Sequence, residues 1–451
     1  MGEAMTQIAA IILAAGKGTR MKSDLHKVLH PIAGRPMLMH LLGSFAELKP
    51  AKQIVVAGDR REQLEAALAG SDVQTVVQDP QLGTAHAALM AKQALAGFDG
   101  LVLICFGDCP FLCAATVRRL CDALSGDAKV AVLGFRPEDT AAYGRIIADA
   151  DGSVTKMIEH KDATEAEREV NLCNSGVIVA HSDNMWRLLE AVGNENAAGE
   201  YYLPDVTTHA IKEGARVVVV ETDADEVAGV NSRAELAEME AKWQKRRRKT
   251  AMDDGATLIA PETVWFAADT SIGRDVLIEP NVFFGPGVTV ADKVNIRANC
   301  HIEGAIIGED CEVGPFARLR PGTVLKEKAK IGNFVEVKKS RLGKGAKANH
   351  LSYIGDADVG AGANIGAGTI TCNYDGYFKY QTVIGEGAFI GSNSALIAPV
   401  KIGRDAIVAA GSAVSRDVAD GELRMVRAEQ LVKPGWADRF HDAMRKKKEG
   451  K

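Results

Sequence analysis

The sequence predicts two joined folds: a doubly wound, Rossmann-like α/β domain and a left-handed parallel β-helix of hexapeptide repeats. Two observations support this prediction. Between residues 7 and 230, short aliphatic segments alternate with segments of helical character, as strands and helices do in a doubly wound sheet. From about Thr270 onward, an aliphatic residue recurs at every sixth position, often followed by glycine or another small residue. A period of six fits neither a helix nor an alternating strand, so it indicates a solenoid with one short strand and one turn per hexapeptide.

Length and composition agree with a two-part chain and exclude some classes of function. At 451 residues the chain is too long for one ordinary core. Its 54 basic and 59 acidic side chains give a net charge of −5, which favours neither nucleic acid nor an anionic membrane as a partner. The eight cysteines contain no CxxC pair and are expected to be reduced thiols. No apolar run is long enough to span a membrane. We therefore expect a cytoplasmic protein that binds neither nucleic acid nor membrane.

The aliphatic segments of the first part predict its strands and helices. The expected strands are 8–13, 53–57, 73–78, 101–106 and 129–135, and the expected helices are 36–48, 62–69, 85–96 and 114–124. A charged helix over 232–250, with Ser232 as its N-cap, is expected to connect the two halves. The resulting division is a first domain over 1–231, a helical linker over 232–255 and a second domain over 256–451.

The repeat predicts the second part in detail. Its inward-facing residues form three runs: Ile272, Ile278, Phe284, Val290, Ile296 and Ile302; Ile307, Val313, Leu319, Leu325, Ile331 and Val337; and Ile384, Ile390, Leu396, Ile402, Val408 and Val414. The solenoid is expected to run from about 257 to 418, with one-residue slips near 302–307, 337–342 and 354–359. The segment CNYDGYFKYQ interrupts the repeat between Thr371 and Ile384. Such insertions protrude as loops and tend to carry function.

A glycine-rich loop and three charged residues predict a phosphate-binding site in the first domain. The strand 8–13 runs into AAGKGTRM, and glycines in such a loop let backbone N–H groups approach anionic oxygens. The spacing matches neither the GxGxxG fingerprint nor the Walker A motif. Arg20 and Lys27 follow as cations suited to a departing pyrophosphate. Asp108 follows the strand 101–106, at the sheet edge where a Mg²⁺ ligand would lie. Its alternative role is a helix N-cap.

His350 marks a second candidate site. It lies at a slip between two repeats, where polar residues are displaced from the regular pattern. A charged group lies within about one 18-residue coil upstream: Arg318, Arg320, Glu336, Lys338 and Lys339. A cationic set suits a sugar phosphate, and histidine is a common general base near neutral pH. The alternative is a structural histidine packed at the slip.

The loop Leu13–Met21, LAAGKGTRM, resembles the LAAGxGTRM loop of the sugar-phosphate nucleotidyltransferases. The order of further motifs is also similar: DLHKVLH (24–30), QDPQLGTAHA (78–87), FGDCP (106–110), YGRI (143–146), EHKD (159–162), NSG (174–176) and GVNSR (229–233). With the hexapeptide half included, nearly the whole chain resembles the bacterial bifunctional N-acetylglucosamine-1-phosphate uridylyltransferases/glucosamine-1-phosphate acetyltransferases. In this resemblance, the first domain is the uridylyltransferase and the second the acetyltransferase.

The resemblance implies two reactions and their partners. Acetyl transfer from acetyl-CoA to glucosamine 1-phosphate would be followed by uridylyl transfer from UTP, with release of pyrophosphate. The product, UDP-N-acetylglucosamine, supplies peptidoglycan and lipopolysaccharide synthesis. Mg²⁺ is the implied cofactor, and a homotrimer built through the β-helix domains is the implied assembly. Three residues depart from the family's pattern: His26 replaces a usual proline, Phe106 a common tyrosine and Ala85 a common glycine. Ala85 could narrow the space beside the uracil.

For the first site, the resemblance also implies individual roles. UTP or UDP-N-acetylglucosamine would be bound by Leu13, Ala14, Ala15, Gly16, Lys27, Gln78, Gly83, Thr84, Phe106, Gly107, Asp108, Gly144, Glu159, Asn174 and Asn231. Asp108 and Asn231 would bind Mg²⁺. Arg20 and Lys27 would assist uridylyl transfer by neutralising phosphate charge.

For the second site, His350 would be the general base and Glu336 would orient its imidazole. The acceptor sugar phosphate would be held by Arg320, Lys338, Tyr353 and Asn364. Acetyl-CoA would be held by Ala367, Asn373, Tyr374, Ser392, Ala410 and Arg427.

Two other functions remain open at this point. A monofunctional nucleotidyltransferase could use its β-helix only for regulation, but His350 with its charged neighbours and the insertion argue against that. A non-catalytic nucleotide-sensing subunit, like the exchange subunits of a translation factor, would be expected to have lost Arg20, Lys27 or Asp108. All three are present.

Overall fold

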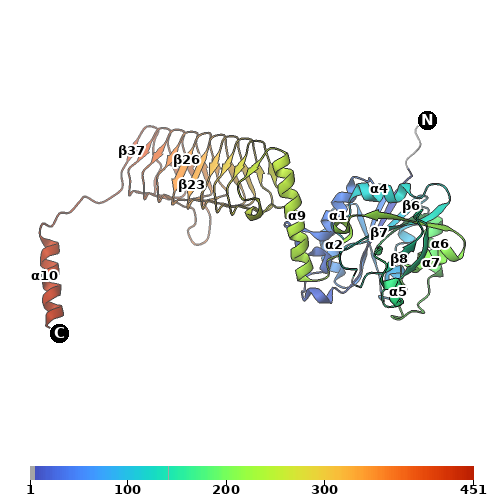
Figure 1. Cartoon of the computed structure of the whole chain (residues 1–451). Helices are drawn as coiled ribbons and strands as arrows, with labels where there is room; N and C mark the ends of the chain where they lie inside the picture. The colour runs from blue at the N-terminus through green and yellow to red at the C-terminus, as the bar shows by residue number, and fades with distance from the viewer. Residues whose placement is uncertain (1–5, 141, 451) are drawn as a thin grey trace, which may run out of the picture. The chain divides into compact units, whose positions relative to one another are not determined.

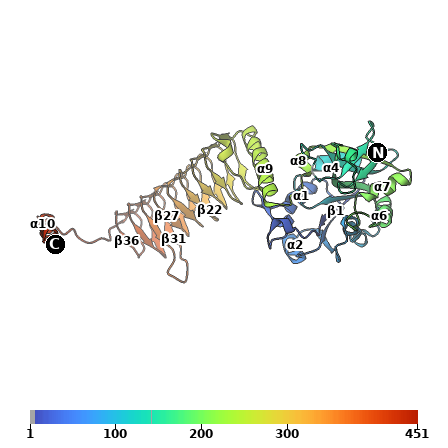
Figure 2. The same cartoon turned by 60° about the horizontal axis from the view of Figure 1, so that its bottom comes forward.

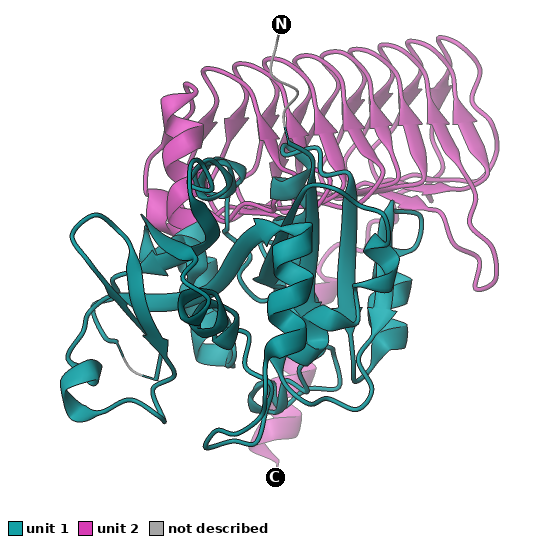
Figure 3. Cartoon of the chain, turned by 90° about the vertical axis from the view of Figure 1, so that its right-hand side faces the viewer, with its two compact units in different colours: residues 1–243 teal, residues 244–451 magenta. Residues whose placement is uncertain are grey.

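The computed structural model describes residues 6–140 and 142–450, and the chain forms two compact units (Figure 1). The first unit extends to Trp243 and the second begins at Gln244 (Figure 3). Among the described helices, none combines the length and the apolar character needed to cross a membrane.

A mixed sheet forms the centre of the first unit. Its strand order is β11-β7-β10-β6-β1-β4-β5, and all neighbours are parallel except those of β10, which is antiparallel to β6 and β7. The bounds are β1 Ile8–Ala14, β4 Lys52–Ala57, β5 Val73–Val77, β6 Leu101–Phe106, β7 Ala128–Phe135, β10 Cys173–His181 and β11 Arg216–Thr222. Strand β8 (Arg145–Ala148) pairs with β10 and β9 (Val154–Ile158), and β2 (Pro31–Ile32) pairs with β3 (Arg35–Pro36).

Helices cover both faces of this sheet because its central strands are aliphatic on both sides. In β1, Ile11 and Leu13 belong to one buried cluster, whereas Ile12 and Ala14 belong to the other. The first cluster includes residues of α3 (Thr84–Leu89), α6 (Ser182–Ala191) and α7 (Asp205–Lys212). The second includes residues of α1 (Met37–Ala46), α2 (Arg61–Leu68), α4 (Ala114–Asp122) and α8 (Ala224–Val227). Helix α5 spans Glu165–Arg168, and 3₁₀ turns span Thr19–Met21, Lys27–Leu29 and Gln93–Leu95.

The first unit confirms the expected alternation of strands and helices, with two differences. The expected helix 85–96 ends at Leu89, because the next three amides bond to carbonyls three residues back rather than four. A 3₁₀ turn follows at 93–95. The antiparallel insertion of β10 between β6 and β7 was not expected from the sequence.

Helix α9 (Arg233–Asp253) lies at the expected linker position. Ser232 caps it: the Glu235 amide N–H donates to Ser232 Oγ at 3.2 Å, and the Ser232 N–H donates to the Glu235 carboxylate at 3.2 Å. In the first unit, the Ala33 N–H donates to the Glu240 carboxylate at 2.6 Å. The division between the units therefore falls inside this helix.

The C-terminal boundary of the first domain remains a prediction, and truncated fragments of the chain can test it. A fragment ending after Trp243 should fold on its own, because it keeps the Glu240 contact with Ala33 and the packing of Trp243 on His40, whose ring centroids are 6.3 Å apart. The fragment 1–231 lacks both contacts and should be less stable by about 1–3 kcal/mol. Urea unfolding of the two purified fragments measures the difference. Equal stabilities would show that α9 adds nothing to the first domain.

Gln244 anchors the same helix to the second unit. Its side chain is 1% exposed; its Nε2 donates to the Phe266 carbonyl at 2.7 Å, and its Oε1 accepts from the Phe266 N–H at 2.9 Å. Gln244→Ala would leave both backbone groups without this partner, so we expect a loss of about 2–4 kcal/mol in the free energy of unfolding. The shift of the β-helix unfolding transition in urea measures this loss. Lys245→Ala, an exposed change on the same helix, is the control and should have little effect.

Three parallel sheets of short strands form the second unit (Figure 2). The first sheet contains β12 Thr257–Leu258, β14 Leu277–Ile278, β17 Asn295–Ile296, β20 Glu312–Val313, β23 Lys330–Asn333, β26 Lys347–His350, β29 Asn364–Ile365, β32 Phe389–Ile390, β35 Ile407–Val408 and β37 Leu423–Arg424. The second contains β13 Ser271–Ile272, β16 Thr289–Val290, β19 Ala305–Ile307, β22 Thr323–Leu325, β25 Arg341–Leu342, β28 Ala357–Val359, β31 Thr382–Ile384 and β34 Val400–Ile402. The third contains β15 Phe283–Phe284, β18 His301–Ile302, β21 Arg318–Leu319, β24 Glu336–Lys338, β27 Tyr353–Gly355, β30 Ile370–Cys372, β33 Ala395–Ile397 and β36 Ala413–Val414.

Consecutive hexapeptides enter the three sheets in turn, so this unit is the expected parallel β-helix. All residues of the three predicted inward-facing runs are buried except Ile272, which is partly buried near the start of the solenoid. Equivalent residues of neighbouring coils are 18 apart in a regular coil, as for Asn281 and Asn299. They are 17 apart where the register slips, as for Asn333 and His350.

The insertion and the C-terminal segment lie outside the regular coils. The insertion leaves the solenoid between β30 and β31 and is bridged between Tyr374 and Lys379. A 3₁₀ turn spans Pro261–Thr263 near the start of the solenoid. After β37 the chain continues to helix α10 (Trp436–Glu449), whose residues are all exposed.

Candidate active sites

The first unit contains a cleft of about 1580 Å³, lined by residues at the carboxyl ends of β1 and β6. Typical small-molecule pockets measure roughly 300–1,000 Å³, so this cleft has room for a nucleotide and a sugar together. The expected binding residues that line it are Leu13, Ala14, Ala15, Gly16, Lys27, Gln78, Gly83, Thr84, Phe106, Asp108, Gly144, Glu159, Asn174 and Asn231. Gly107 is not among the lining residues; its N–H donates to the Leu13 carbonyl at 2.9 Å. Arg20 lies on an exposed 3₁₀ turn and is also outside the lining.

Lys27 joins the two residues expected to bind the metal. Its Nζ forms an ion pair with Asp108 Oδ2 and donates to Asn231 Oδ1 at 3.1 Å. The Val230 N–H donates to the Asp108 carbonyl at 3.1 Å, which holds the two chain segments together. Two oxygens from segments far apart in sequence therefore converge on one cation in the cleft.

The glycine-rich loop lets Lys27 approach this position. Gly18 has a left-handed backbone, with φ 59°, and a Cβ added there would lie 2.8 Å from Lys27 Cβ. A larger residue at position 18 would therefore be strained and would displace the lysine. Gly16 is exposed at the cleft, so its backbone is open to an anion.

Polar groups from β8, β9 and β10 form another part of the cleft. Gly144 precedes β8, and its carbonyl accepts from the Asn174 N–H at 2.9 Å. The Asn174 Oδ1 accepts from the Gly176 N–H at 2.8 Å, which fixes the amide orientation. Glu159 follows β9, and burial, reinforced by two nearby aspartates, raises the pKa of its carboxyl group. These acceptors suit the hydroxyl and amide groups of a sugar.

The three residues that depart from the family pattern differ in whether they line the cleft: His26 and Phe106 do, and Ala85 does not. Ala85 is fully buried in the core and does not line the cleft, so its methyl group does not narrow the nucleotide space. The Phe106 ring packs against Gly176. His26 lines the cleft but is only 3% exposed; its Nδ1 accepts from the Val28 N–H at 3.4 Å. Burial lowers the pKa of His26, against an opposing effect of the nearby Ala14 carbonyl, and so favours the neutral ring.

The second candidate site centres on His350, at the end of β26. Asn333 ends β23 in the neighbouring coil and lies in register with it, with His350 Nδ1 and Asn333 Oδ1 2.6 Å apart. With the amide oxygen as acceptor, Nδ1 carries the proton and Nε2 is free to accept one. Glu336, expected to orient the imidazole, instead accepts from Arg320 at 2.8 Å and lies 3.8 Å from Arg318. The structure thus gives His350 a different partner.

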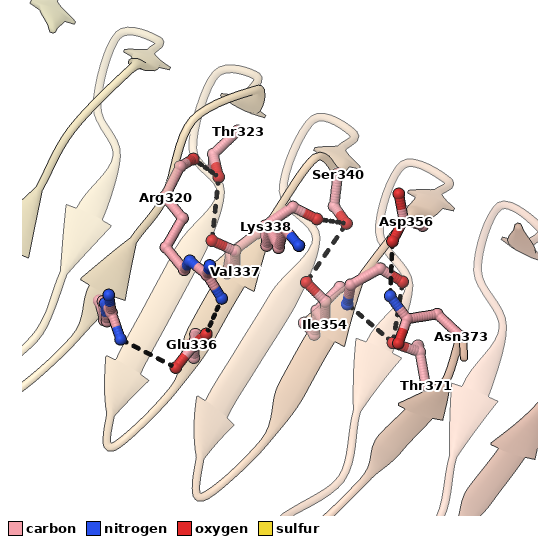
Figure 4. Close-up of polar contacts among 12 residues, drawn as sticks. Arg320, Thr323, Glu336, Val337, Lys338, Ser340, Ile354, Asp356, Thr371 and Asn373 are labelled. Atoms are coloured by element: carbon pink, nitrogen blue, oxygen red, sulfur yellow. Dashed lines mark hydrogen bonds and ion pairs between the residues drawn. The ribbon is translucent and has the colours of Figure 1, made fainter. Parts of the chain in front are cut away.

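Cationic side chains gather on the third sheet, which the chain enters at Tyr353 shortly after His350. Arg320 and Lys338 come from neighbouring coils (Figure 4), and Tyr353 follows on the next strand, β27. Lys379 comes from the insertion, and its proximity is the main cause that lowers the pKa of Lys338. Close cations repel one another unless an anion lies between them, so the arrangement suits a phosphate. Asn364 lies on β29 of the first sheet.

The residues expected to bind acetyl-CoA form two groups. One group lies on successive corners of the solenoid, which are linked by backbone hydrogen bonds: Ala367, Ser392 and Ala410. These corners form a column along the solenoid. Arg427 lies at its end, where its Nη1 donates to the Ala410 carbonyl at 2.8 Å. The second group, Asn373 and Tyr374, begins the insertion.

In the single chain, the second site is exposed to solvent. His350 is exposed, and three apolar side chains project from neighbouring corners: Phe316 is 48% exposed, Phe334 55% and Leu351 62%. All three have left-handed backbones, and the rings of Phe316 and Phe334 stack at 5.1 Å. The site therefore borders an uncovered apolar ridge.

Sequence reasoning missed two residues of the second site, Asn333 and Lys379. Asn333 precedes His350 by one slipped coil, so counting 17 rather than 18 residues back would have found it. Lys379 is a cation inside an insertion expected to carry function, and that expectation was its only signal.

Comparisons with known proteins match both halves of the chain. Residues 10–253 match the MobA-like NTP transferase domain, residues 255–342 the GMPPB C-terminal domain and residues 381–416 the bacterial transferase hexapeptide (six repeats). The chain is 70% identical over 444 residues to the bifunctional protein GlmU of Novosphingobium aromaticivorans and 68% identical over 443 residues to that of Sphingopyxis alaskensis; each alignment covers 98% of both chains. It is 52% identical over 447 residues to the bifunctional protein GlmU of Paramagnetospirillum magneticum, covering 99% of both chains.

Proposed function

The chain belongs to the family of the bifunctional GlmU proteins, and from this premise we propose that it catalyses two consecutive group transfers that yield UDP-N-acetylglucosamine. The observation that carries the proposal is that one chain holds two sites of different chemistry. The first unit has a large cleft with a lysine between two oxygen ligands, and the β-helix has an exposed histidine beside a cationic surface.

The β-helix site acetylates glucosamine 1-phosphate. Nε2 of His350 takes a proton from the 2-ammonium group of the sugar, while Asn333 holds the opposite ring nitrogen. The free amine attacks the thioester carbonyl of acetyl-CoA, the C–S bond breaks and coenzyme A leaves as the thiol. Arg320 and Lys338, with Lys379, hold the sugar phosphate, and the column ending at Arg427 holds coenzyme A.

The cleft then uridylylates the product. A phosphate oxygen of N-acetylglucosamine 1-phosphate attacks the α-phosphorus of UTP, and pyrophosphate leaves. This nucleophile is already anionic near neutral pH, so no general base is needed, and the protein has to align the groups and screen their charge. Lys27 neutralises phosphate inside the cleft, and Arg20, on the exposed turn, neutralises charge at its edge.

Asp108 and Asn231 are the residues that would hold Mg²⁺. Their oxygens already converge on the Lys27 ammonium group, so the position accepts a cation. Among the described residues, no group of three or more His, Cys, Asp or Glu side chains is suited to a metal ion. A set of two protein oxygens fits Mg²⁺, which commonly takes its other ligands from phosphates and water. When bound, Mg²⁺ supplies neutralisation of phosphate charge.

The assembly we propose is a homotrimer formed through the β-helices. The apolar ridge beside His350 supports it, because a second copy that covered Phe316, Phe334 and Leu351 would also enclose the acetylation site. Light scattering of the purified protein should give three times the 48.0 kDa of one chain. The substrates are small cytoplasmic metabolites, so we place the enzyme in the cytoplasm, where its product supplies peptidoglycan and lipopolysaccharide synthesis.

One assay tests the proposed function. With acetyl-CoA, glucosamine 1-phosphate, UTP and Mg²⁺, the protein should release both free thiol and pyrophosphate. Without UTP it should release thiol alone, and without acetyl-CoA it should release neither. A nucleotidyltransferase with a purely regulatory β-helix would instead release pyrophosphate from UTP and N-acetylglucosamine 1-phosphate and never release thiol.

A further inference from the structure

Asp356 ties both ends of the insertion to the solenoid. It lies between β27 and β28, with a left-handed backbone of φ 48°. Asn373, where the insertion begins, donates through Nδ2 to the Asp356 carboxylate (Figure 4), and the Thr382 N–H, where the insertion ends, donates to the Asp356 carbonyl at 3.1 Å. The Asp356 N–H donates to the Lys338 carbonyl at 3.0 Å. One residue thus connects both stems of the insertion to the strand that carries an acceptor-site cation.

The bond to Asn373 is the part of this connection that a side chain controls. Asn373 is only 6% exposed, so its amide depends on a partner inside the protein. The partner is a carboxylate, and hydrogen bonds to ionised groups are stronger than neutral ones. The position of Asn373 passes on to the loop, because the Tyr380 N–H donates to the Asn373 carbonyl at 2.9 Å and Tyr374 bridges to Lys379.

Without this connection, electrostatic repulsion between two lysines would favour movement of the insertion away from the solenoid. Lys379 lowers the pKa of Lys338, as expected for two ammonium groups that repel each other. The Asp356 carboxylate opposes this repulsion at Lys338, whose pKa it raises while Lys379 lowers it. Asp356 therefore acts on the lysine pair both through the fold and through its charge.

We propose that Asp356 is a positioning residue for acetyl transfer: it fixes both stems of the insertion, so that Lys379 stands beside Lys338 at the acceptor phosphate. This inference rests on the proposed acetyltransferase function. It assigns Asp356 no contact with the substrate.

Two substitutions distinguish the contribution of the Asp356 carboxylate from that of its backbone. Asp356→Gly removes the side chain, and glycine adopts this φ without strain. Asp356→Asn keeps an oxygen that accepts from Asn373, and asparagine tolerates the left-handed region. Asp310→Gly is the matched control, because Asp310 is an exposed aspartate with φ 58° on another corner of the same solenoid.

For Asp356→Gly we expect the KM for glucosamine 1-phosphate to rise about tenfold or more, with a smaller change in kcat, because the loss is one of ground-state binding. Asp356→Asn should restore most of this affinity. Uridylyl transfer should stay at its normal rate in both variants, and Asp310→Gly should match the parent protein. Lys379→Ala should raise the same KM in the parent but add little to Asp356→Gly, since the lysine is then already displaced.

A second readout does not depend on activity. Tyr377 is 86% exposed and Phe378 67% at the tip of the insertion, and release of the Asn373 stem should speed chymotrypsin cleavage there several-fold in Asp356→Gly. A parental KM with a parental cleavage rate would overturn the proposal. So would a loss of activity that merely follows a lower melting temperature and occurs equally in Asp310→Gly. If the parent protein transfers no acetyl group at all, the proposed function fails instead, and cleavage alone still decides whether Asp356 fixes the insertion.

Discussion

Replacing His350 with alanine should lower the kcat of acetyl transfer by about 10²–10⁴-fold, the usual range for a lost general base. The sugar amine is protonated near neutral pH and cannot attack the thioester until a base removes its proton. The KM for glucosamine 1-phosphate should change little, because Arg320 and Lys338 are retained. Uridylyl transfer should be unaffected, since its cleft lies in the other unit and requires no base.

The control for this variant is His301→Ala. His301 is also an exposed histidine of the solenoid, but it stacks on Phe283 at 4.9 Å, on β18 near the start of the solenoid. It should leave both activities near normal. If His350 only packs at the slip in the repeat, its replacement will instead lower the melting temperature and leave kcat at the parental value. Measuring both quantities on one preparation separates the two accounts, and a parental kcat would refute the base assignment.

The period of six was sufficient to predict the inner surface of the β-helix. An inward-facing residue is determined by its own position within the hexapeptide, so residues such as Ile296 and Val408 could be assigned individually, and both are fully buried. Contacts between coils are harder to predict, because they depend on how many residues each coil contains. Asn333 meets His350 only because that coil has 17 residues, and one more would have shifted the pair by a position.

The family resemblance implied that Glu336 would orient the imidazole of His350, which follows it by less than one coil. In the β-helix, however, Glu336 lies on the third sheet, in register with Arg318 and Tyr353, whereas His350 ends a strand of the first sheet. The partner of His350 is Asn333, which lies on the neighbouring strand of the same sheet.

At the first site too, some contacts could be predicted from local sequence patterns, whereas others could not. The glycine-rich loop and Asp108 follow aliphatic strands, and the carboxyl ends of parallel strands meet at one sheet edge, so their convergence could be expected. Asn231 is separated from Lys27 by 204 residues, and no local pattern links the two. Only the resemblance to a family suggested its role. Arg20, expected like Lys27 to neutralise phosphate, has an exposed side chain and lies outside the cleft lining.

Replacing Asp108 with alanine should reduce uridylyl transfer by about 10³-fold or more and leave acetyl transfer nearly intact. A metal ion contributes several kcal/mol of charge stabilisation in such a transfer, and each ~1.4 kcal/mol is a factor of ten in rate. The backbone of residue 108 would remain in place, because its carbonyl, not its side chain, accepts from the Val230 N–H. The loss would therefore report on the carboxylate, which now pairs with Lys27.

The dependence on Mg²⁺ concentration gives this prediction a second measurement. Asp108→Asn keeps the shape of the side chain but removes its charge, so the Mg²⁺ concentration for half-maximal uridylyl transfer should rise about tenfold or more. Asp122→Ala, at the exposed end of α4, is the control and should change neither the rate nor the Mg²⁺ requirement. Equal loss of both activities in a folded Asp108→Ala protein would contradict the two-site assignment. An unchanged Mg²⁺ requirement in Asp108→Asn would mean that the carboxylate serves only to hold Lys27, because a ligand that has lost its charge cannot bind the cation as tightly as before.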